Sequence, residues 1–222
     1  RNSEGEVDSN ALMAWSAQVL KLSSDLECAE FRPADLTIEK LKEVARLSVY
    51  NTGPLKARQL LARLGIPVVI LEHLPHTYLD GACFLDLNDR PVIGLTLRHN
   101  RLDNFWFTLM HELSHVYLHL LHGDRRIFCD DTERLDQTRD ESEMQADQLT
   151  ADLLIAPERW AEEKERLFSA RDSRIVIDLA ENLGISPAII AGRVRYELRD
   201  YALFNHLLGA GEVKYLFEPA TA

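Results

Sequence analysis

The chain has 222 residues, of which 46% are hydrophobic and 27% charged, and its formal net charge is −11 at pH 7. That length and hydrophobic content suffice for one core of good size, so we expect one domain, alone or with a small appendage. The negative charge argues against a nucleic-acid backbone as ligand, because phosphate contacts require a basic surface. No apolar run reaches about 18 residues, so no transmembrane span is expected.

The sequence shows no secretory signal, and we therefore expect a cytoplasmic protein with no membrane partner. Its three cysteines, Cys28, Cys83 and Cys129, are odd in number and widely separated. They form neither a disulfide framework nor a CxxC metal knuckle. We interpret them as reduced structural thiols.

The N-terminal third predicts helices. Residues 1 to 10 are polar, carry no fold signal and are expected to be a disordered or linker end. Helical patterns follow over residues 10 to 30 and 37 to 64. The second is broken between Asn51 and Pro54, where Asn, Gly and Pro interrupt it.

A small sheet is predicted next. The β-branched run at residues 66 to 71 predicts one strand, and residues 81 to 87 with 91 to 97 predict a hairpin. Helices flanking such a sheet give an α+β fold. The segment PVIGLTL, residues 91 to 97, has two readings: an edge strand that holds an extended substrate by strand addition, or an interior strand.

The most informative segment is FWFTLMHELSHVYLHLLH, residues 105 to 122, which contains an HExxH sequence in a helical pattern. Positions i and i+4 lie on one helix face, so His111 and His115 can reach a single metal ion. Glu112 is offset by one residue, which places its carboxylate beside the metal, within reach of a bound water. We interpret Glu112 as the candidate general base.

The alternative is that His111 and His115 are ordinary, partly buried helix residues and that Glu112 faces water. Apolar neighbours on several sides argue against it, because buried ionisable groups need partners and a metal ion supplies one. These neighbours are Phe105, Trp106, Leu109, Leu113 and Val116.

A third ligand is expected from a second helix within residues 140 to 160, with Pro157 marking its end. Glu141 and Glu143 are both possible ligands. We assign Glu143, because a carboxylate, Asp147, follows one turn later on its face and could accept the other ring N–H of a ligand histidine. The alternative is that Glu143 and Asp147 form a solvated helix face.

Residues 175 to 198 have the pattern of a helix-turn-helix, with Gly184 in the turn and Ser186 capping the second helix. DNA reading is disfavoured, because acidic residues surround its few arginines. We expect a helical subdomain that closes over the metal cleft. Groups that could then polarise a scissile carbonyl are Arg193, Arg195, Arg199 and Tyr196.

The other histidines are not expected to bind the metal. His119 lies two turns from His111 and would have to reach past His115, so a structural or cleft-wall role is favoured for it and for His122. No partner at metal-ligand spacing accompanies His73, His76, His99 or His206.

With both helices identified, residues 40 to 160 resemble the ImmA/IrrE family of metallopeptidase domains. The resemblance rests on TLMHELSH, on the preceding PVIGLTL and on EMQADQLTADLLIAP. It implies a zincin-like metallopeptidase fold, with the active-site helix packed against a small sheet and mostly helical terminal segments. It also implies that His111, His115 and Glu143 bind the metal and that Glu112 is the catalytic glutamate.

Two departures from the family pattern are present. Ser114 stands where the family most often has Gly or Ala, and Ala156 is an extra residue before Pro157. Many members carry an XRE-type helix-turn-helix ahead of the peptidase domain. That implies a C-terminal part of such a regulator, with DNA contact only through a module absent from this chain. We expect a metallopeptidase-like domain over residues 11 to 160 and a helical subdomain over residues 161 to 222.

Three functional hypotheses remain. The first is a zinc-dependent metalloendopeptidase, with Mn²⁺ as an alternative metal, that cleaves a protein such as a transcriptional repressor in a stress or phage-related response. The second is a metal-binding sensor domain of a transcriptional regulator with little or no proteolytic activity. The third is an interaction domain whose HExxH sequence binds nothing.

Overall fold

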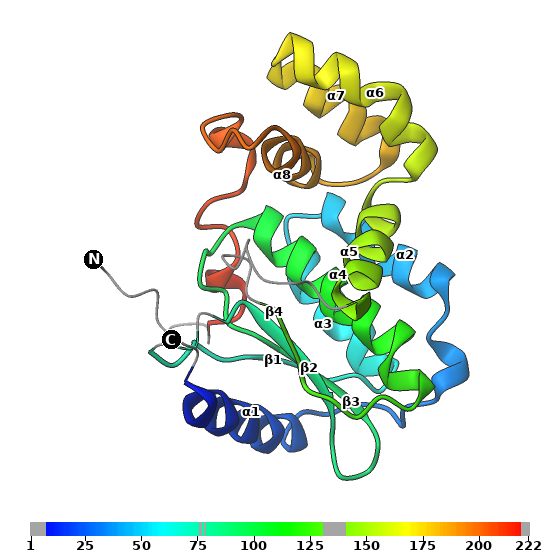
Figure 1. Cartoon of the computed structure of the whole chain (residues 1–222), viewed down its shortest axis with the longest axis vertical. Helices are drawn as coiled ribbons and strands as arrows, with labels where there is room; N and C mark the ends of the chain where they lie inside the picture. The colour runs from blue at the N-terminus through cyan, green and yellow to red at the C-terminus, as the bar shows by residue number, and fades with distance from the viewer. Residues whose placement is uncertain (1–7, 76, 78, 131–140, 219–222) are drawn as a thin grey trace.

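The computed structural model describes residues 8–75, 77, 79–130 and 141–218, and its elements form layers around one small sheet (Figure 1). The sheet holds four strands, which are β1 (Val68–Ile70), β2 (Gly81–Leu85), β3 (Pro91–Leu95) and β4 (Phe128–Asp130). Their order is β1-β3-β2-β4. β1 runs parallel to β3, and the other two pairs are antiparallel.

The predicted hairpin is confirmed as β2 and β3, joined by a turn in which Asp86 accepts hydrogen bonds from the backbone of Asn88 and Arg90. The edge-strand reading of PVIGLTL is wrong. Both sides of β3 are paired, and the edges of the described sheet are β1 and β4. The sequence did not predict β4, because a three-residue strand carries too little pattern to be recognised.

Helix α1 (Ser9–Ser24) covers one face of the sheet. Gly94 of β3 makes this close packing possible, because a Cβ there would lie 2.5 Å from the Trp15 ring. The helix is shorter than predicted at its C-terminal end. It also begins earlier than expected, since Asp8 caps its first turn and Ser9 and Asn10 are helical.

Helices α2 (Ile38–Arg46), α3 (Gly53–Arg63), α4 (Leu102–Leu118) and α5 (Glu141–Leu154) lie on the other face (Figure 1). The predicted break before Pro54 is confirmed, since Pro54 stands in the first turn of α3. A single apolar cluster joins these helices to the sheet, with Trp106, Leu109 and Leu113 of α4 at its centre. The predicted α+β architecture is therefore present.

Helices α6 (Pro157–Ala170), α7 (Ser173–Leu183) and α8 (Pro187–Leu198) extend the same core. As predicted, α5 ends shortly before Pro157, at Leu154, and Pro157 is the first residue of α6. The predicted α7–α8 pair is confirmed, with Gly184 left-handed at φ 65° and Ser186 accepting from the Ala188 N–H. No helix of the described residues is long and apolar enough to cross a membrane.

Candidate metal centre

The HExxH segment lies in the second half of α4, where both sides of the helix are covered. The side chains of Glu112 and His115 have no exposed surface, and His111 is 6% exposed. The helix packs on α5 along one side and on β2 along another. The three polar residues are therefore held inside the protein, where each needs a partner.

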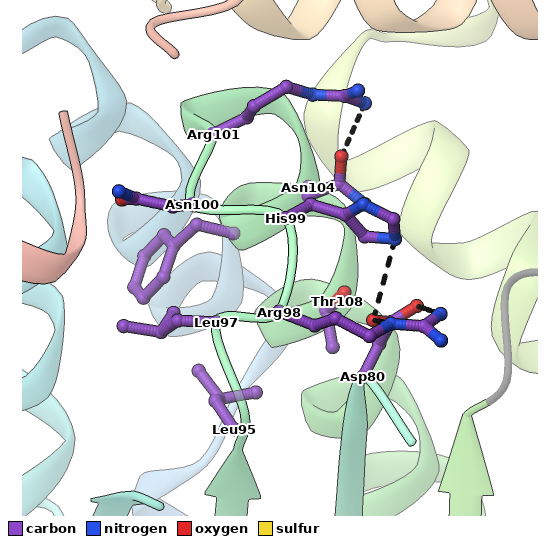
Figure 2. Close-up of a pocket in the computed structure, with 10 residues that line it drawn as sticks. Asp80, Leu95, Leu97, Arg98, His99, Asn100, Arg101, Asn104 and Thr108 are labelled. Atoms are coloured by element: carbon purple, nitrogen blue, oxygen red, sulfur yellow. Dashed lines mark hydrogen bonds and ion pairs between the residues drawn. The ribbon is translucent and has the colours of Figure 1, made fainter. Parts of the chain in front are cut away.

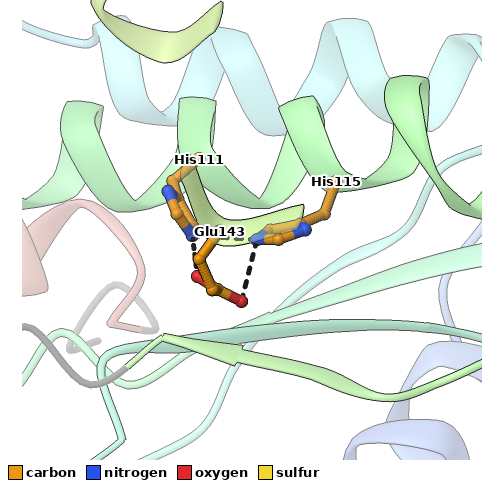
Figure 3. A group of neighbouring side chains, drawn as sticks. All are labelled: His111, His115 and Glu143. Carbon is orange, nitrogen blue, oxygen red and sulfur yellow. Dashed lines mark hydrogen bonds and ion pairs between the residues drawn. The ribbon is translucent and has the colours of Figure 1, made fainter. Parts of the chain in front are cut away.

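The structure brings His111, His115 and Glu143 together (Figure 3). The Nε2 atoms of the two histidines are 3.0 Å apart. Glu143 Oε2 lies 3.2 Å from His111 Nε2, and Glu143 Oε1 lies 3.4 Å from His115 Nε2. Three donor atoms from two helices thus converge on one point.

These distances fit the donor set of a zinc ion. Two ligand atoms about 2.0 to 2.1 Å from one ion, at the tetrahedral angle, lie about 3.3 to 3.4 Å apart. The contacts of 3.0, 3.2 and 3.4 Å are close to that spacing. Two imidazole nitrogens and one carboxylate also leave a fourth position for water, as catalytic zinc sites require.

Asp147 lies on the far side of the His111 ring. Its Oδ1 atom is 3.2 Å from His111 Nδ1. Donation of the Nδ1 hydrogen to this carboxylate leaves a lone pair on Nε2, which faces the point of convergence. His115 is oriented differently, because its ring stacks on Phe128 of β4 with centroids 4.3 Å apart.

The electrostatics favour the protonation states that bind a metal. Burial raises the pKa of Glu143, but the contacts with His111 and His115 outweigh that effect and hold this pKa well below its ordinary value. Burial lowers the pKa of His115, although Glu143 partly opposes the shift. An ionised carboxylate and a neutral imidazole are the forms in which these side chains bind a metal.

Glu112 projects toward β2 rather than toward α5. A Cβ built on Gly81, the first residue of β2, would lie 2.9 Å from Glu112 Oε1 and 2.6 Å from Thr108 Cγ2. Only glycine at this position leaves room for the glutamate. Gly81 could have been recognised from the sequence, because a glycine in a strand often marks a close approach of another group.

The other sequence candidates lie outside this group. Glu141 is exposed and accepts a hydrogen bond from Gln145, so the structure brings only Glu143 of the two candidate ligands to the histidines. His119 Nε2 lies 3.2 Å from the carbonyl oxygen of Ser142, which is a structural contact between α4 and α5. His76 and the side chain of Cys129 lie outside the described residues.

Among the described residues, the C-terminal helices do not close over the metal ligands. α8 packs on the first turns of α4, where Gly192 meets Asp103 and Phe107. Arg195 donates to the Leu203 carbonyl, and Arg193 lies over the Trp160 ring with its Cζ 4.2 Å from the centroid. Arg193 also donates to the Ala151 carbonyl of α5, and Arg199 lies over the Tyr196 ring with its Cζ 5.6 Å from the centroid. These contacts pack the candidate side chains against α5, α6 and the C-terminal segment, so we look for a carbonyl-polarising group elsewhere.

Comparison with protein families identifies the chain. A peptidase-family model, described as the IrrE N-terminal-like domain, matches residues 61–195, which is more than half of the chain. The chain belongs to this family. The match confirms the ImmA/IrrE resemblance and extends it beyond residue 160, through α6, α7 and most of α8. A comparison with curated proteins found no match.

For this member of the IrrE-like family, the contact between Asp147 and His111 leads to a first prediction. Asp147→Ala should keep the fold and lower zinc affinity by roughly 10- to 100-fold, because His111 loses its orienting acceptor. Competition with a chromophoric chelator measures the affinity. Asp152→Ala, a change at a half-buried carboxylate on the same helix that accepts a hydrogen bond from Gln148, is the control. Unchanged affinity in Asp147→Ala would show that this contact does not tune the metal.

Proposed function

We propose that this chain is a zinc-dependent metalloendopeptidase. The observation that carries the proposal is the convergence of three ligand atoms, from His111, His115 and Glu143, next to a fully buried glutamate, Glu112. Membership of a peptidase family supports the same reaction class. An interaction domain would have no need for this arrangement, because burying the ionisable side chains of His111, Glu112 and His115 beside a half-buried Glu143 costs stability.

In the proposed reaction, His111, His115 and Glu143 hold the metal and Asp147 fixes the tautomer of His111. When bound, zinc supplies a Lewis acid that acidifies water and polarises the substrate carbonyl. Glu112 accepts the proton of the attacking water and passes it to the nitrogen of the leaving amine. The tight contact with Gly81 limits the positions that this carboxylate can take.

The substrate is an extended segment of a protein. β4 is an edge of the described sheet, and its Phe128 stacks on His115, so this strand lies directly beside the candidate metal ligands. No described strand pairs with its outer side, which can pair with a peptide by strand addition and would then lay the peptide across the metal site. We therefore assign substrate pairing to β4 and not to β3, which was the candidate strand in the sequence.

We further propose that the substrate is a transcriptional repressor in a stress or phage-related response and that the reaction occurs in the cytoplasm. The resemblance to the ImmA/IrrE family implies a regulatory substrate, and the acidic chain makes its own contact with DNA unfavourable. DNA binding would then come from a separate module. Zinc is the proposed metal, and Mn²⁺ is tested beside it.

The experiment incubates metal-loaded protein with the purified repressor encoded beside its gene. We expect one zinc ion per chain by elemental analysis and two repressor fragments by mass spectrometry. Chelator treatment should stop cleavage, and zinc should restore it more effectively than Mn²⁺. A fully loaded protein that releases no fragments would overturn the peptidase proposal and favour the sensor hypothesis.

A further inference from the structure

The face of α4 that carries the histidine ligands continues toward the start of the helix. At about 100° per residue, Asn104, Thr108, His111 and His115 fall within an arc of about 60°. Thr108 precedes His111 by about 4.5 Å of helix rise. Side chains that face Thr108 therefore lie about one helical turn from His111.

The wall opposite this face consists of Asp80, which precedes β2, and the loop of residues 96 to 101 that joins β3 to α4 (Figure 2). Between the wall and the helix lies a cavity of about 20 Å³, which is room for one water molecule. Asp80, His99, Asn104 and Thr108 line it. The residue after Asp80 is Gly81, where an added Cβ would lie 2.9 Å from Glu112 Oε1, so the chain that forms this wall continues into the strand that packs on the candidate general base.

The polar groups of this wall differ in exposure. Arg98 donates to both carboxylate oxygens of Asp80, at 3.1 and 3.3 Å, and its side chain is 14% exposed. His99 Nε2 lies 3.8 Å from Asp80 Oδ1, which is too long for a hydrogen bond, and its side chain is 31% exposed. Asp80 thus lies beside the ring at more than hydrogen-bond distance, and an imidazole N–H can donate to another acceptor.

We propose that His99 contacts the substrate as a hydrogen-bond donor. Its imidazole N–H donates to the carbonyl oxygen of the scissile peptide bond as that oxygen gains negative charge, and no proton is transferred. Asp80 positions the His99 ring, and Arg98 holds the Asp80 carboxylate in place through two hydrogen bonds. The inference rests on the proposed peptidase function and supplies the carbonyl-polarising group that the arginines of α8 do not provide.

The first test measures turnover of a fluorogenic peptide that spans the repressor cleavage site. Removal of one such donor costs roughly 10²- to 10³-fold in kcat, so His99→Ala should show that loss with nearly unchanged KM and full metal content. His99→Gln keeps an N–H donor and should recover part of the rate. His122→Ala, at an exposed histidine beyond the end of α4, is the control and should match the parent.

The second test needs no turnover. An N-phosphoryl dipeptide presents a tetrahedral anion to the zinc-loaded protein, whereas a dipeptide hydroxamate chelates the metal through planar oxygens. Loss of a hydrogen bond to a charged group weakens binding by roughly 10- to 100-fold. His99→Ala should therefore bind the phosphoryl compound more weakly by that factor and bind the hydroxamate as tightly as the parent does. Asp80→Asn should show a smaller loss of the same kind.

The outcomes separate the two proposals. Unchanged kcat and unchanged phosphoryl affinity in His99→Ala would each overturn the role of His99. A parent protein that holds zinc but never cleaves overturns the peptidase function instead. In that case the phosphoryl measurement still decides whether His99 contacts a tetrahedral anion at the metal.

Discussion

Glu112→Gln is expected to bind zinc and fold like the parent but to cleave its substrate at least about 10²- to 10⁴-fold more slowly, which is the usual contribution of a general acid–base group. The amide has nearly the same shape as the carboxylate, so it fits the space against Gly81. It cannot accept the proton of the attacking water. Single-turnover cleavage of the repressor, with elemental analysis of the same sample, measures both properties.

Because binding and chemistry separate in this variant, uncut repressor should also be recovered more efficiently in a pull-down with Glu112→Gln than with the parent. Glu141→Gln makes the same chemical change at an exposed residue on α5 and should cleave normally. Should Glu112→Gln support the same biological response as the parent, the metal would hold a conformation rather than serve catalysis. The sensor hypothesis would then replace the peptidase.

Replacement of a candidate ligand is the second change with a large expected effect. Glu143→Ala removes the carboxylate that lies 3.2 and 3.4 Å from the two histidine nitrogens. Mutation of a residue that only hydrogen-bonds to a metal ligand lowers metal affinity by at most roughly 100-fold. Because Glu143 is itself a candidate ligand, its loss should lower zinc affinity by more than that. Excess zinc at 100 times the dissociation constant stabilises the parent by about 2.7 kcal/mol, and this stabilisation should be absent in the variant.

Thermal unfolding with and without zinc measures this stabilisation, and equilibrium dialysis gives the number of ions per chain. Glu141→Ala is the matched control, because Glu141 stands two residues earlier and was the alternative ligand in the sequence. Full occupancy in Glu143→Ala together with loss in Glu141→Ala would reverse the ligand assignment. The register of α5 against α4 would then have to shift.

Local periodicity explains why much of the candidate site could be predicted. The spacing of His111 and His115 is one helical turn, and the apolar residues around them identify the helix without knowledge of any neighbour. The same rule separated Glu143 from Glu141, because only Glu143 has a carboxylate one turn later. The structure brings all of these residues together, at the distances given above.

Strand order could not be predicted in this way. PVIGLTL reads equally well as an edge or an interior strand, because alternation within a strand says nothing about how many neighbours it has. The three residues of β4 show no pattern at all. Its position decides which strand borders the metal ligands, and with it the proposed path of the substrate.

The sequence by itself therefore determined the family, the active-site helix, the three candidate ligands and the residue that supports His111, because each depends on spacing within one helix or on a motif. Only the tertiary structure decided which groups surround them. Gly81 against Glu112, Phe128 on His115, and His99 beside Asp80 are contacts between separate segments. Such contacts depend on how the sheet packs on α4, and no local pattern in the sequence encodes that packing.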